Sequence, residues 1–463
     1  MAIYSTHARA LIRARVRSWC VGCAMEPENI EEYVEEIQHL LSHYSWLFDF
    51  KMTQMLSGNV FDLMPVHWFE FGKDAAVEVL HDVAEGTPKD NWPPGLASFV
   101  GRCGRLRRWQ LRCDEPTNES PLPEALTRGV SAKKRHELRR MVPAVTGLCT
   151  RTGLHLVMDV GAGLGHLAES LRQSTQLRIL GVERDASLLE AAGRRRRRLT
   201  ESGAAGCPAC WRIVRCEVAD SDSGQQRLQR LAAEFAADRC ACRDATQQPT
   251  GGWCLTGLHC CGDLAPQLLR LLVRLPEARA LLLLSCCYHK AADGRLLSRR
   301  LATVRLGHFG RRLACQQSVS AWCHQSAADH ARHATAVGWR ALLEVVAQRT
   351  GLTVSDRRRH GTHRYANFAE YAAAMLGAAD DNADCDQRLL QCTANDVFKQ
   401  YGAQLRCVEF LTALQACLQP VLEGLLLLDR MLFLREHAIS AELMPLFEDQ
   451  LSPRTWALMA WKT

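Results

Sequence analysis

The feature that most constrains this sequence is a series of short apolar runs alternating with stretches of helical periodicity. Five runs have the length of buried strands: 154–159, 178–183, 211–217, 252–258 and 280–285. Helical stretches lie between them, at 164–173, 185–199, 225–237 and 264–275. Strands that are joined by helices run parallel to one another. The segment therefore predicts an α/β fold with a parallel sheet between layers of helices.

Helical patterns on both sides of this segment indicate further domains, because 463 residues exceed one ordinary domain. We expect an N-terminal helical domain over 1–120, strands one to five over 125–290, a helical insertion over 291–435 and a C-terminal hairpin over 436–463. Two apolar runs, 441–447 and 456–462, form the expected antiparallel hairpin.

A glycine-rich loop directly follows the first predicted strand and opens a helix. It contains Asp159, Gly161, Ala162, Gly163 and Gly165. Glycines allow the backbone to approach a ligand closely, and the N–H groups at a helix start favour an electron-rich partner. The spacing Gly-x-Gly-x-Gly differs from the Gly-x-Gly-x-x-Gly of dinucleotide-binding proteins. The alternative is a tight turn without a ligand.

Acidic residues at the ends of the next two strands support a nucleoside ligand. Glu183 ends the second strand, where a carboxylate can accept hydrogen bonds from both hydroxyls of a ribose. Asp220 and Asp222 follow the third strand, within reach of an adenine edge. Together with the glycine loop, this pattern resembles class I S-adenosylmethionine-dependent methyltransferases. The resemblance implies S-adenosyl-L-methionine as the cofactor, held by Asp159 and the glycines at its amino acid end.

Polar residues after the fourth and fifth strands are candidates for the methyl-acceptor side. His259 and Asp263 follow the fourth strand, and Tyr288 follows the fifth. Ligands of open α/β sheets bind beyond the carboxyl ends of the strands, so His259 and Asp263 can orient or deprotonate an acceptor, and His259 can also contact the cofactor. The competing interpretation is that the neighbouring cysteines and one histidine are buried packing residues.

Several further stretches point to one family. They are Ser131 to Glu137, the loop from Asp159 to Gly165, Leu258 to Leu264, Cys286 to Tyr288, and Leu451 to Arg454 followed by Ala457 and Leu458. Together these stretches resemble the methyltransferase-like proteins called ribosomal RNA adenine dimethylase domain-containing. The resemblance covers roughly residues 131–463 and implies a seven-stranded, Rossmann-like class I fold that binds S-adenosylmethionine.

The fourth-strand motif argues against the activity in that family's name. Enzymes that dimethylate adenine in ribosomal RNA look as if they need an Asn-Leu/Ile-Pro-Tyr/Phe step there, whereas this chain has His259 to Asp263. Tyr288 could stack on a base instead. We therefore expect methyl transfer to a nitrogen or oxygen nucleophile without specifying the acceptor.

The charge of the chain suggests a polyanionic partner. Lys and Arg number 57 against 50 Asp and Glu, and the excess is clustered, notably at 133–140 and 194–198. Such segments suit RNA, although solvated helix faces look the same. A protein substrate, or a scaffold without turnover, is the alternative. The longest apolar run, 280–288, is too short to span a membrane, so we expect no membrane insertion.

The 21 cysteines indicate a reducing, intracellular compartment, cytoplasmic or nuclear, because they lack the spacing of a disulfide scaffold. The arginines among the first 25 residues resemble those of a mitochondrial transit peptide, but we expect an N-terminal amphipathic helix there instead. Cys207 and Cys210, with Cys240 and Cys242, have zinc-ligand spacings. Such pairs arise readily by chance among so many cysteines, so we predict no metal site.

Overall fold

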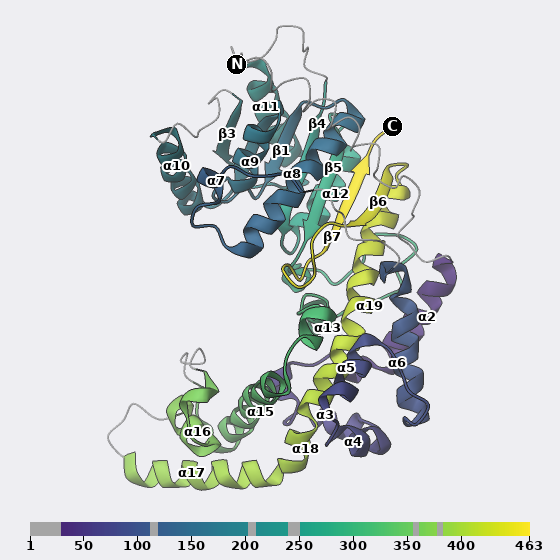
Figure 1. Ribbon diagram of the computed structural model, residues 1–463, viewed down its shortest axis with the longest axis vertical. Coiled ribbons are helices and arrows are strands. Elements are labelled where there is room, and N and C mark those ends of the chain that lie inside the picture. The colour runs from purple at the N-terminus through teal and green to yellow at the C-terminus, as the bar shows by residue number, and fades with distance from the viewer. Residues whose placement is uncertain (1–28, 112–118, 202–209, 239–250, 355–360, 377–382) are drawn as a thin grey trace. The chain divides into compact units, whose positions relative to one another are not determined.

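The computed structural model describes residues 29–111, 119–201, 210–238, 251–354, 361–376 and 383–463 (Figure 1). These residues divide into two compact units. Unit 1 comprises the described parts of 109–305 and 424–463. Unit 2 comprises 29–108 and the described parts of 306–423.

Unit 1 is built on a seven-stranded sheet with the order β3-β2-β1-β4-β5-β7-β6. The strands are β1 (Leu156–Val160), β2 (Arg178–Glu183), β3 (Trp211–Arg215), β4 (Trp253–Cys260), β5 (Ala278–Ser285), β6 (Ser440–Pro445) and β7 (Trp456–Trp461). Strands β1 to β5 are parallel, and β7 runs antiparallel between β5 and β6. The predicted α/β class with a closing hairpin is confirmed.

Helices cover both faces of this sheet (Figure 1). They are α7 (Glu124–Thr127), α8 (Ala132–Thr152), α9 (His166–Ser174), α10 (Ala186–Glu201), α11 (Asp222–Ala237) and α12 (Leu264–Arg274). Buried side chains of α8 and α9 pack with Leu282 and Leu284 of β5 in one apolar cluster. Leu283 lies on the opposite face beside Leu268 of α12. Successive strand residues alternate between the two layers, as pleating requires.

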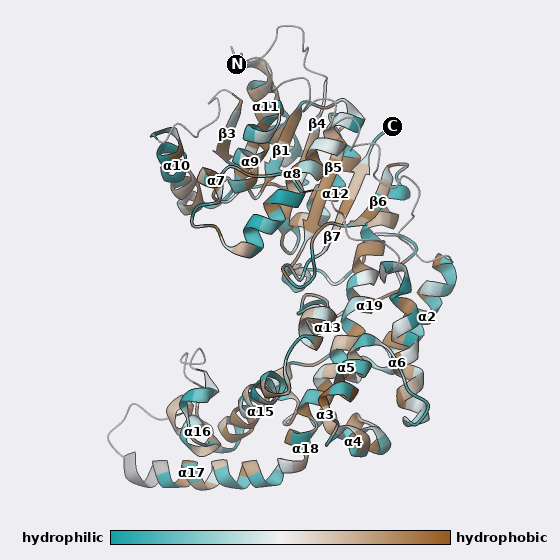
Figure 2. Cartoon of the chain, viewed as in Figure 1, coloured by the Kyte–Doolittle hydropathy of each residue, from teal (hydrophilic) through white to brown (hydrophobic). Residues whose placement is uncertain are grey.

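The central strands are apolar because both of their faces are covered. All six residues of β2 are buried, and Figure 2 shows β1, β4 and β5 in the brown of hydrophobic residues. Such continuous apolar runs are typical of parallel sheets between helical layers. Because the strands are continuous apolar runs, the sequence predicted each strand end to within two residues of its position in the structure.

Unit 2 is helical and combines two distant stretches of the sequence. From the first stretch come α2 (Ile30–His43), α3 (Val60–Leu63), α4 (Val66–Gly72), α5 (Val77–Glu85) and α6 (Pro94–Leu106). From the second come α13 (His308–Leu313), α14 (Val319–Cys323), α15 (Ala327–Thr350), α16 (Phe368–Leu376), α17 (Ala383–Gln400) and α18 (Gly402–Arg406). The long helix α19 (Val408–Arg435) contributes residues to both units.

A buried polar chain joins the two stretches within unit 2. Nδ1 of His330 lies 2.6 Å from a carboxylate oxygen of Glu409, and Nε2 of His330 lies 3.1 Å from Nε2 of His81. These residues belong to α15, α19 and α5. The expected domains 1–120 and 291–435 are therefore not separate in this structure, since their helices share one interior.

The length of uninterrupted apolar runs predicted no segment that could span a membrane, but helix α19 meets that condition when its polar residues are counted in. Among the described residues it is the one helix long and apolar enough to cross a membrane by length and composition. In the folded chain, 83% of its most apolar stretch is buried inside the protein. A core helix of a globular protein has the same properties.

Two acidic residues of unit 1 hold the segment that follows β5: Asp429 of α19, and Glu436, which directly follows that helix. The carboxylate of Asp429, 3% exposed, accepts the backbone N–H groups of Leu297 and Ser298 at 2.9 and 2.8 Å. Glu436 accepts those of Arg299 and Arg300 at 3.0 and 3.3 Å, but it is only half-buried. Asp429 and Glu436 thus bind the same segment in the same way, but only the carboxylate of Glu436 is accessible to water.

We predict that Asp429→Ala lowers the free energy of unfolding by about 2 kcal/mol or more, because a buried N–H group and a partly buried one lose their acceptor. Glu436→Ala is the matched control, and it should cost about 1 kcal/mol or less because water can replace the lost carboxylate. Urea unfolding of both full-length variants measures the difference. Equal losses would contradict the assigned role of burial.

Candidate functional site

A cavity of about 590 Å³ opens at the carboxyl edge of the sheet in unit 1. This volume lies in the range of small-molecule and cofactor sites. Four of the predicted site residues line the cavity: Gly161, Glu183, His259 and Asp263. The lining also includes Val160, Val182, Arg184, Cys216, Glu217, Val218, Cys261, Gly262, Leu264, Gln267 and Lys290.

The glycine loop bends through left-handed backbone conformations at three positions. The φ angles of Gly161, Gly163 and Gly165 are 71°, 54° and 75°, a region that glycine enters without steric cost. A Cβ on Gly165 would lie 2.7 Å from Ile213, so this glycine is needed for packing. A Cβ on Gly161 would have only Leu264 within 4 Å, at 3.8 Å. Space therefore remains in front of Gly161, where a ligand can approach the backbone.

Glu183 connects the loop to the end of β2. Its Oε2 accepts the N–H of Gly163 at 2.9 Å, and its Oε1 accepts the N–H of Asp185 at 3.0 Å. An ionised carboxylate offers about four acceptor positions, so these two bonds leave others for a ligand. Glu183 is therefore fixed in place by the backbone and retains the capacity to accept hydroxyl groups.

Asp159 does not line the cavity, and neither do the loop residues Ala162, Gly163 and Gly165. Burial raises the pKa of Asp159 from its ordinary 3.8 to about 7. The charge of Lys134 opposes this shift, and the charge of Glu183 adds to it. Among the described residues, Oδ2 of Asp159 has no hydrogen-bond partner. The carboxylate is therefore poised between its neutral and ionised forms near neutral pH.

His259 protrudes from an irregularity in β4. Leu258 pairs with Leu284 and Cys260 pairs with Ser285, so His259 is an extra residue in the register, a β-bulge. Its φ is 69°, a left-handed value that histidine adopts more readily than most residues. Bulges recur next to active sites because they redirect a side chain.

The ring of His259 is held by a buried acid from α8. Its Nε2 lies 2.9 Å from Oε1 of Glu137, which is 1% exposed. Burial raises the pKa of Glu137, but the hydrogen bond and charge of His259 and the charges of Lys134 and Lys133 together lower it below its usual value. An ionised carboxylate only accepts, so Nε2 donates the proton of this hydrogen bond, and Nδ1 is the ring nitrogen left to exchange a proton with a ligand. Glu137 belongs to a stretch that carries the family resemblance, but its contact with His259 was not predicted.

Asp263 lines the cavity and also connects two loops. Both of its carboxylate oxygens accept the backbone N–H of Ala292, at 3.2 and 3.1 Å. The loop after β4 is thereby tied to the segment after β5. This contact gives Asp263 a positioning role that sequence alone did not indicate.

Three further predicted site residues, Asp220, Asp222 and Tyr288, also do not line the cavity. Asp220 contacts Arg270 at 3.4 Å, and Asp222 begins α11. Glu217 and Val218, from the same strand end, line the cavity in their place. Tyr288, 3% exposed, lies under the guanidinium of Arg430. These positions give no support to an adenine contact by Asp220 or Asp222, or to base stacking on Tyr288.

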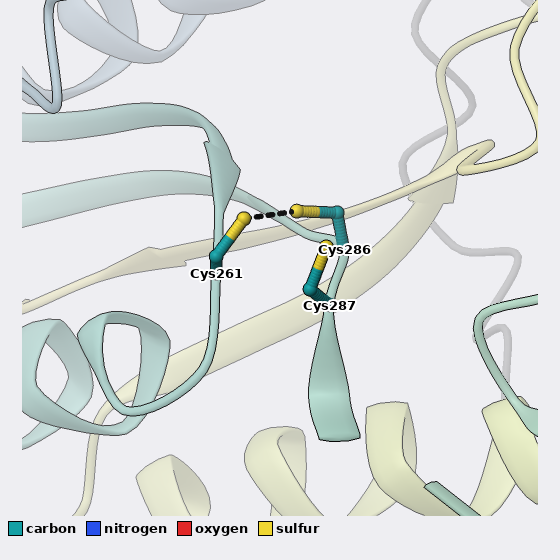
Figure 3. Close-up of side chains that lie close together, drawn as sticks. All are labelled: Cys261, Cys286 and Cys287. Carbon is teal, nitrogen blue, oxygen red and sulfur yellow. Dashed lines mark hydrogen bonds between the residues drawn. The ribbon is translucent and has the colours of Figure 1, made fainter. Parts of the chain in front are cut away.

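The cysteines of the chain occupy different environments. Cys261 lines the cavity and lies beside Cys286 and Cys287, which follow β5 (Figure 3). A hydrogen bond from Cys286 is the largest influence on Cys261 and lowers the pKa of its thiol. Of the cysteines with zinc-ligand spacing, Cys210 is buried, whereas Cys207, Cys240 and Cys242 lie outside the described residues.

Comparison with known proteins identifies the class of domain to which this site belongs. Residues 133–294, about a third of the chain, match the sequence profile of the family described as "Methyltransferase domain". The chain therefore contains a methyltransferase domain, as the glycine loop and its surroundings predicted.

Two relatives carry a more particular name. "Probable methyltransferase-like protein 25" of Mus musculus is 26% identical over 227 residues, which cover 45% of this chain and 37% of the relative. Its counterpart in Homo sapiens is 25% identical over 226 residues, covering 45% and 36%. The match thus spans only about a third of the relatives' length. It names methyltransferase-like protein 25 and does not show the ribosomal RNA adenine dimethylase domain-containing family.

Solved structures also overlap with the chain. One is the methyltransferase domain of a bacterial CtHen1, with 13% identity, a TM-score of 0.22, and coverage of 47% of this chain and 88% of that one. Another is the plantazolicin methyltransferase BpumL in complex with SAH, with 9% identity, a TM-score of 0.21, and coverage of 70% and 91%. Scores this low carry no argument, and the fold assignment rests on the strand order described above.

We predict that Asp159→Asn changes how stability depends on pH. A carboxyl group whose pKa is raised by folding stabilises the protein fully below about pH 4, and this contribution is lost as the pH rises toward 7. The variant cannot titrate there, so its unfolding free energy should gain on wild type by about 4 kcal/mol across that interval. Urea unfolding of both proteins between pH 4 and 8 measures this difference. Parallel pH profiles would contradict the raised pKa.

Proposed function

We propose that this protein is an S-adenosylmethionine-dependent methyltransferase that acts on RNA. The observation that carries the proposal is the 590 Å³ cavity, in which the glycine loop and Glu183 face the acceptor-side residues His259 and Asp263. The methyltransferase domain over residues 133–294 supports the same activity.

The residues present fit the proposed cofactor. The open space in front of Gly161 would admit its amino acid end, and the free acceptor positions of Glu183 would bind the ribose hydroxyls. Glu217 and Val218 line the cavity where the adenine would lie. When bound, the cofactor supplies an activated methyl group on a sulfonium.

The protein's own task is then alignment of the acceptor and removal of one proton. His259 suits this task because Glu137 fixes its ring and leaves Nδ1 as the basic nitrogen. Asp263 acts as a positioning residue through its bonds to Ala292. Lys290 and Arg184 also line the cavity and would attract a polyanionic substrate.

We predict micromolar binding of S-adenosylmethionine and S-adenosylhomocysteine to the full-length protein in calorimetric titration. Glu183→Gln should weaken the affinity at least tenfold, equal to about 1.4 kcal/mol, because one ribose acceptor becomes a donor. The control is Glu190→Gln on α10, whose side chain is 74% exposed and outside the cavity. Absence of binding by the folded wild type would refute the proposal.

RNA is the substrate that the charge around the cavity favours. Lys133 and Lys134, at the start of α8, lie within 4.0 Å of Glu137, which holds His259. The second basic segment, 194–198, lies at the far end of α10, about 18 Å along the helix from the cavity residue Arg184. Segment 133–140 is therefore the better placed of the two for RNA near the site.

We predict that single-stranded RNA binds and that its affinity falls steeply with salt, because phosphate contacts release counterions. Replacing Lys133 and Arg135 by Gln should weaken binding and reduce the salt slope by about 0.7 per lost contact. Replacing Arg197 and Arg198 by Gln removes equal charge at the far end of α10 and serves as the control. Fluorescence anisotropy with labelled RNA measures both. Salt-independent binding, or none, would favour a protein substrate.

The narrower resemblance to ribosomal RNA adenine dimethylase domain-containing proteins remains part of this proposal. The motif after β4, His259 to Asp263, argues against adenine N6 as the acceptor. The burial of Tyr288 under Arg430 also leaves no stacking platform at that position. We therefore assign the substrate class and leave the methylated atom to be identified by mass spectrometry of modified RNA.

A further inference from the structure

Three cysteine thiols converge beside the cavity (Figure 3). Cys261 comes from the loop after β4, and Cys286 and Cys287 come directly after β5. The sulfur atoms of Cys261 and Cys286 lie 2.9 Å apart, and all three sulfur atoms lie within 4.8 Å of one another. The cluster therefore joins the carboxyl ends of two neighbouring strands.

Backbone contacts hold the two loops in this arrangement. The N–H of Gly262 donates to the carbonyl oxygen of Cys287 at 3.1 Å. Gly262 has a φ of 57°, and a Cβ there would lie 2.8 Å from the carbonyl oxygen of Lys290, so no larger residue fits. The contact of Asp263 with Ala292 adds a second connection. The thiols are thus preorganised by the fold.

Packing does not account for this arrangement. Cysteines used as small apolar residues are usually buried, but Cys261 and Cys287 are only half-buried. A disulfide would employ two sulfur atoms and leave the third without a role. Three thiolates are, in contrast, a ligand set that zinc prefers. Tetrahedral zinc with bonds of about 2.3 Å places sulfur atoms about 3.8 Å apart, which is longer than the 2.9 Å between Cys261 and Cys286 and within the 4.8 Å limit of the cluster.

We propose that Cys261, Cys286 and Cys287 bind one zinc ion as thiolates. Each thiol releases its proton to solvent on binding. Among the described residues no fourth histidine, cysteine or acidic ligand atom joins the cluster, so water or a substrate atom completes the tetrahedron. Cys261 lines the cavity and directs this open position toward it.

Charge balance supports the site. Three thiolates and Zn²⁺ carry a net charge of −1, and the ammonium of Lys290 interacts electrostatically with both Cys261 and Cys287. The sequence predicted no metal, because cysteine pairs with zinc-ligand spacing arise readily by chance, and those pairs do not include the three cysteines of this cluster. The proposed site goes beyond methyl transfer and does not depend on it.

The test is the zinc content of the full-length protein, purified with reductant and without chelator, by mass spectrometry of the metal. Cys261→Ala, Cys286→Ala and Cys287→Ala should each lower zinc by one equivalent per chain. Cys260→Ala, which removes a neighbouring buried thiol outside the cluster, should retain it. A variant with both Cys207→Ala and Cys240→Ala tests the other cysteine pairs and should also retain it.

Cobalt substitution of the wild type keeps the proposal testable if the alanine variants misfold. Co²⁺ should give the visible bands of a tetrahedral site with thiolate charge-transfer absorption in the near ultraviolet. Three results would overturn the proposal: wild type without zinc or cobalt, zinc that the three variants do not change, or a Cys261–Cys286 disulfide mapped after alkylation of the reduced preparation. Loss of cofactor binding with zinc retained would refute only the proposed methyltransferase activity.

Discussion

The pairing of β4 between β1 and β5 is the constraint on which the whole site depends. Parallel hydrogen bonding fixes these strands in register, so their carboxyl ends meet at one edge. The loops that leave this edge carry Gly161, His259 and Cys286, residues far apart in the chain. Because both faces of the strands are buried, a slip of one residue would transfer every side chain to the wrong layer. The position of the site is therefore set by the same packing that stabilises the sheet.

The sequence predicted the parts of this structure that depend on local patterns. Apolar runs predicted the strands because parallel strands are buried on both faces. The glycine loop could be recognised because left-handed backbone conformations favour glycine. Gly161 and Gly165 adopt such conformations here. Glu183 could be located because it ends a strand beside that loop. Each of these inferences needs only a short window of sequence and the general geometry of a parallel sheet.

The residues that sequence analysis missed or misplaced depend on contacts across long separations. Glu137 and His259 are 122 residues apart, so no spacing rule could pair them. Tyr288 looked available for stacking, but a guanidinium from α19 covers its ring. The sequence predicted two separate helical domains, since contacts between the two stretches cannot be recognised from sequence spacing. The contact of His330 with His81, for example, joins residues that are 249 positions apart. Side-chain availability and domain boundaries are properties of tertiary packing, which a single sequence does not display.

The bulge at His259 couples the two sides of the site physically. A left-handed conformation costs a residue with a side chain about 1–2 kcal/mol, and the bond to the buried Glu137 offsets that cost. Two residues further on, Cys261 meets the loop after β5, and Gly262 fixes that contact through Cys287. The turn from β4 into α12 is thus held at two points: Glu137 of α8 binds His259, and the loop after β5 binds Gly262 through Cys287. Displacement of either anchor would move His259 relative to the cavity, so the position of its ring and the geometry of the thiols depend on one short segment of backbone.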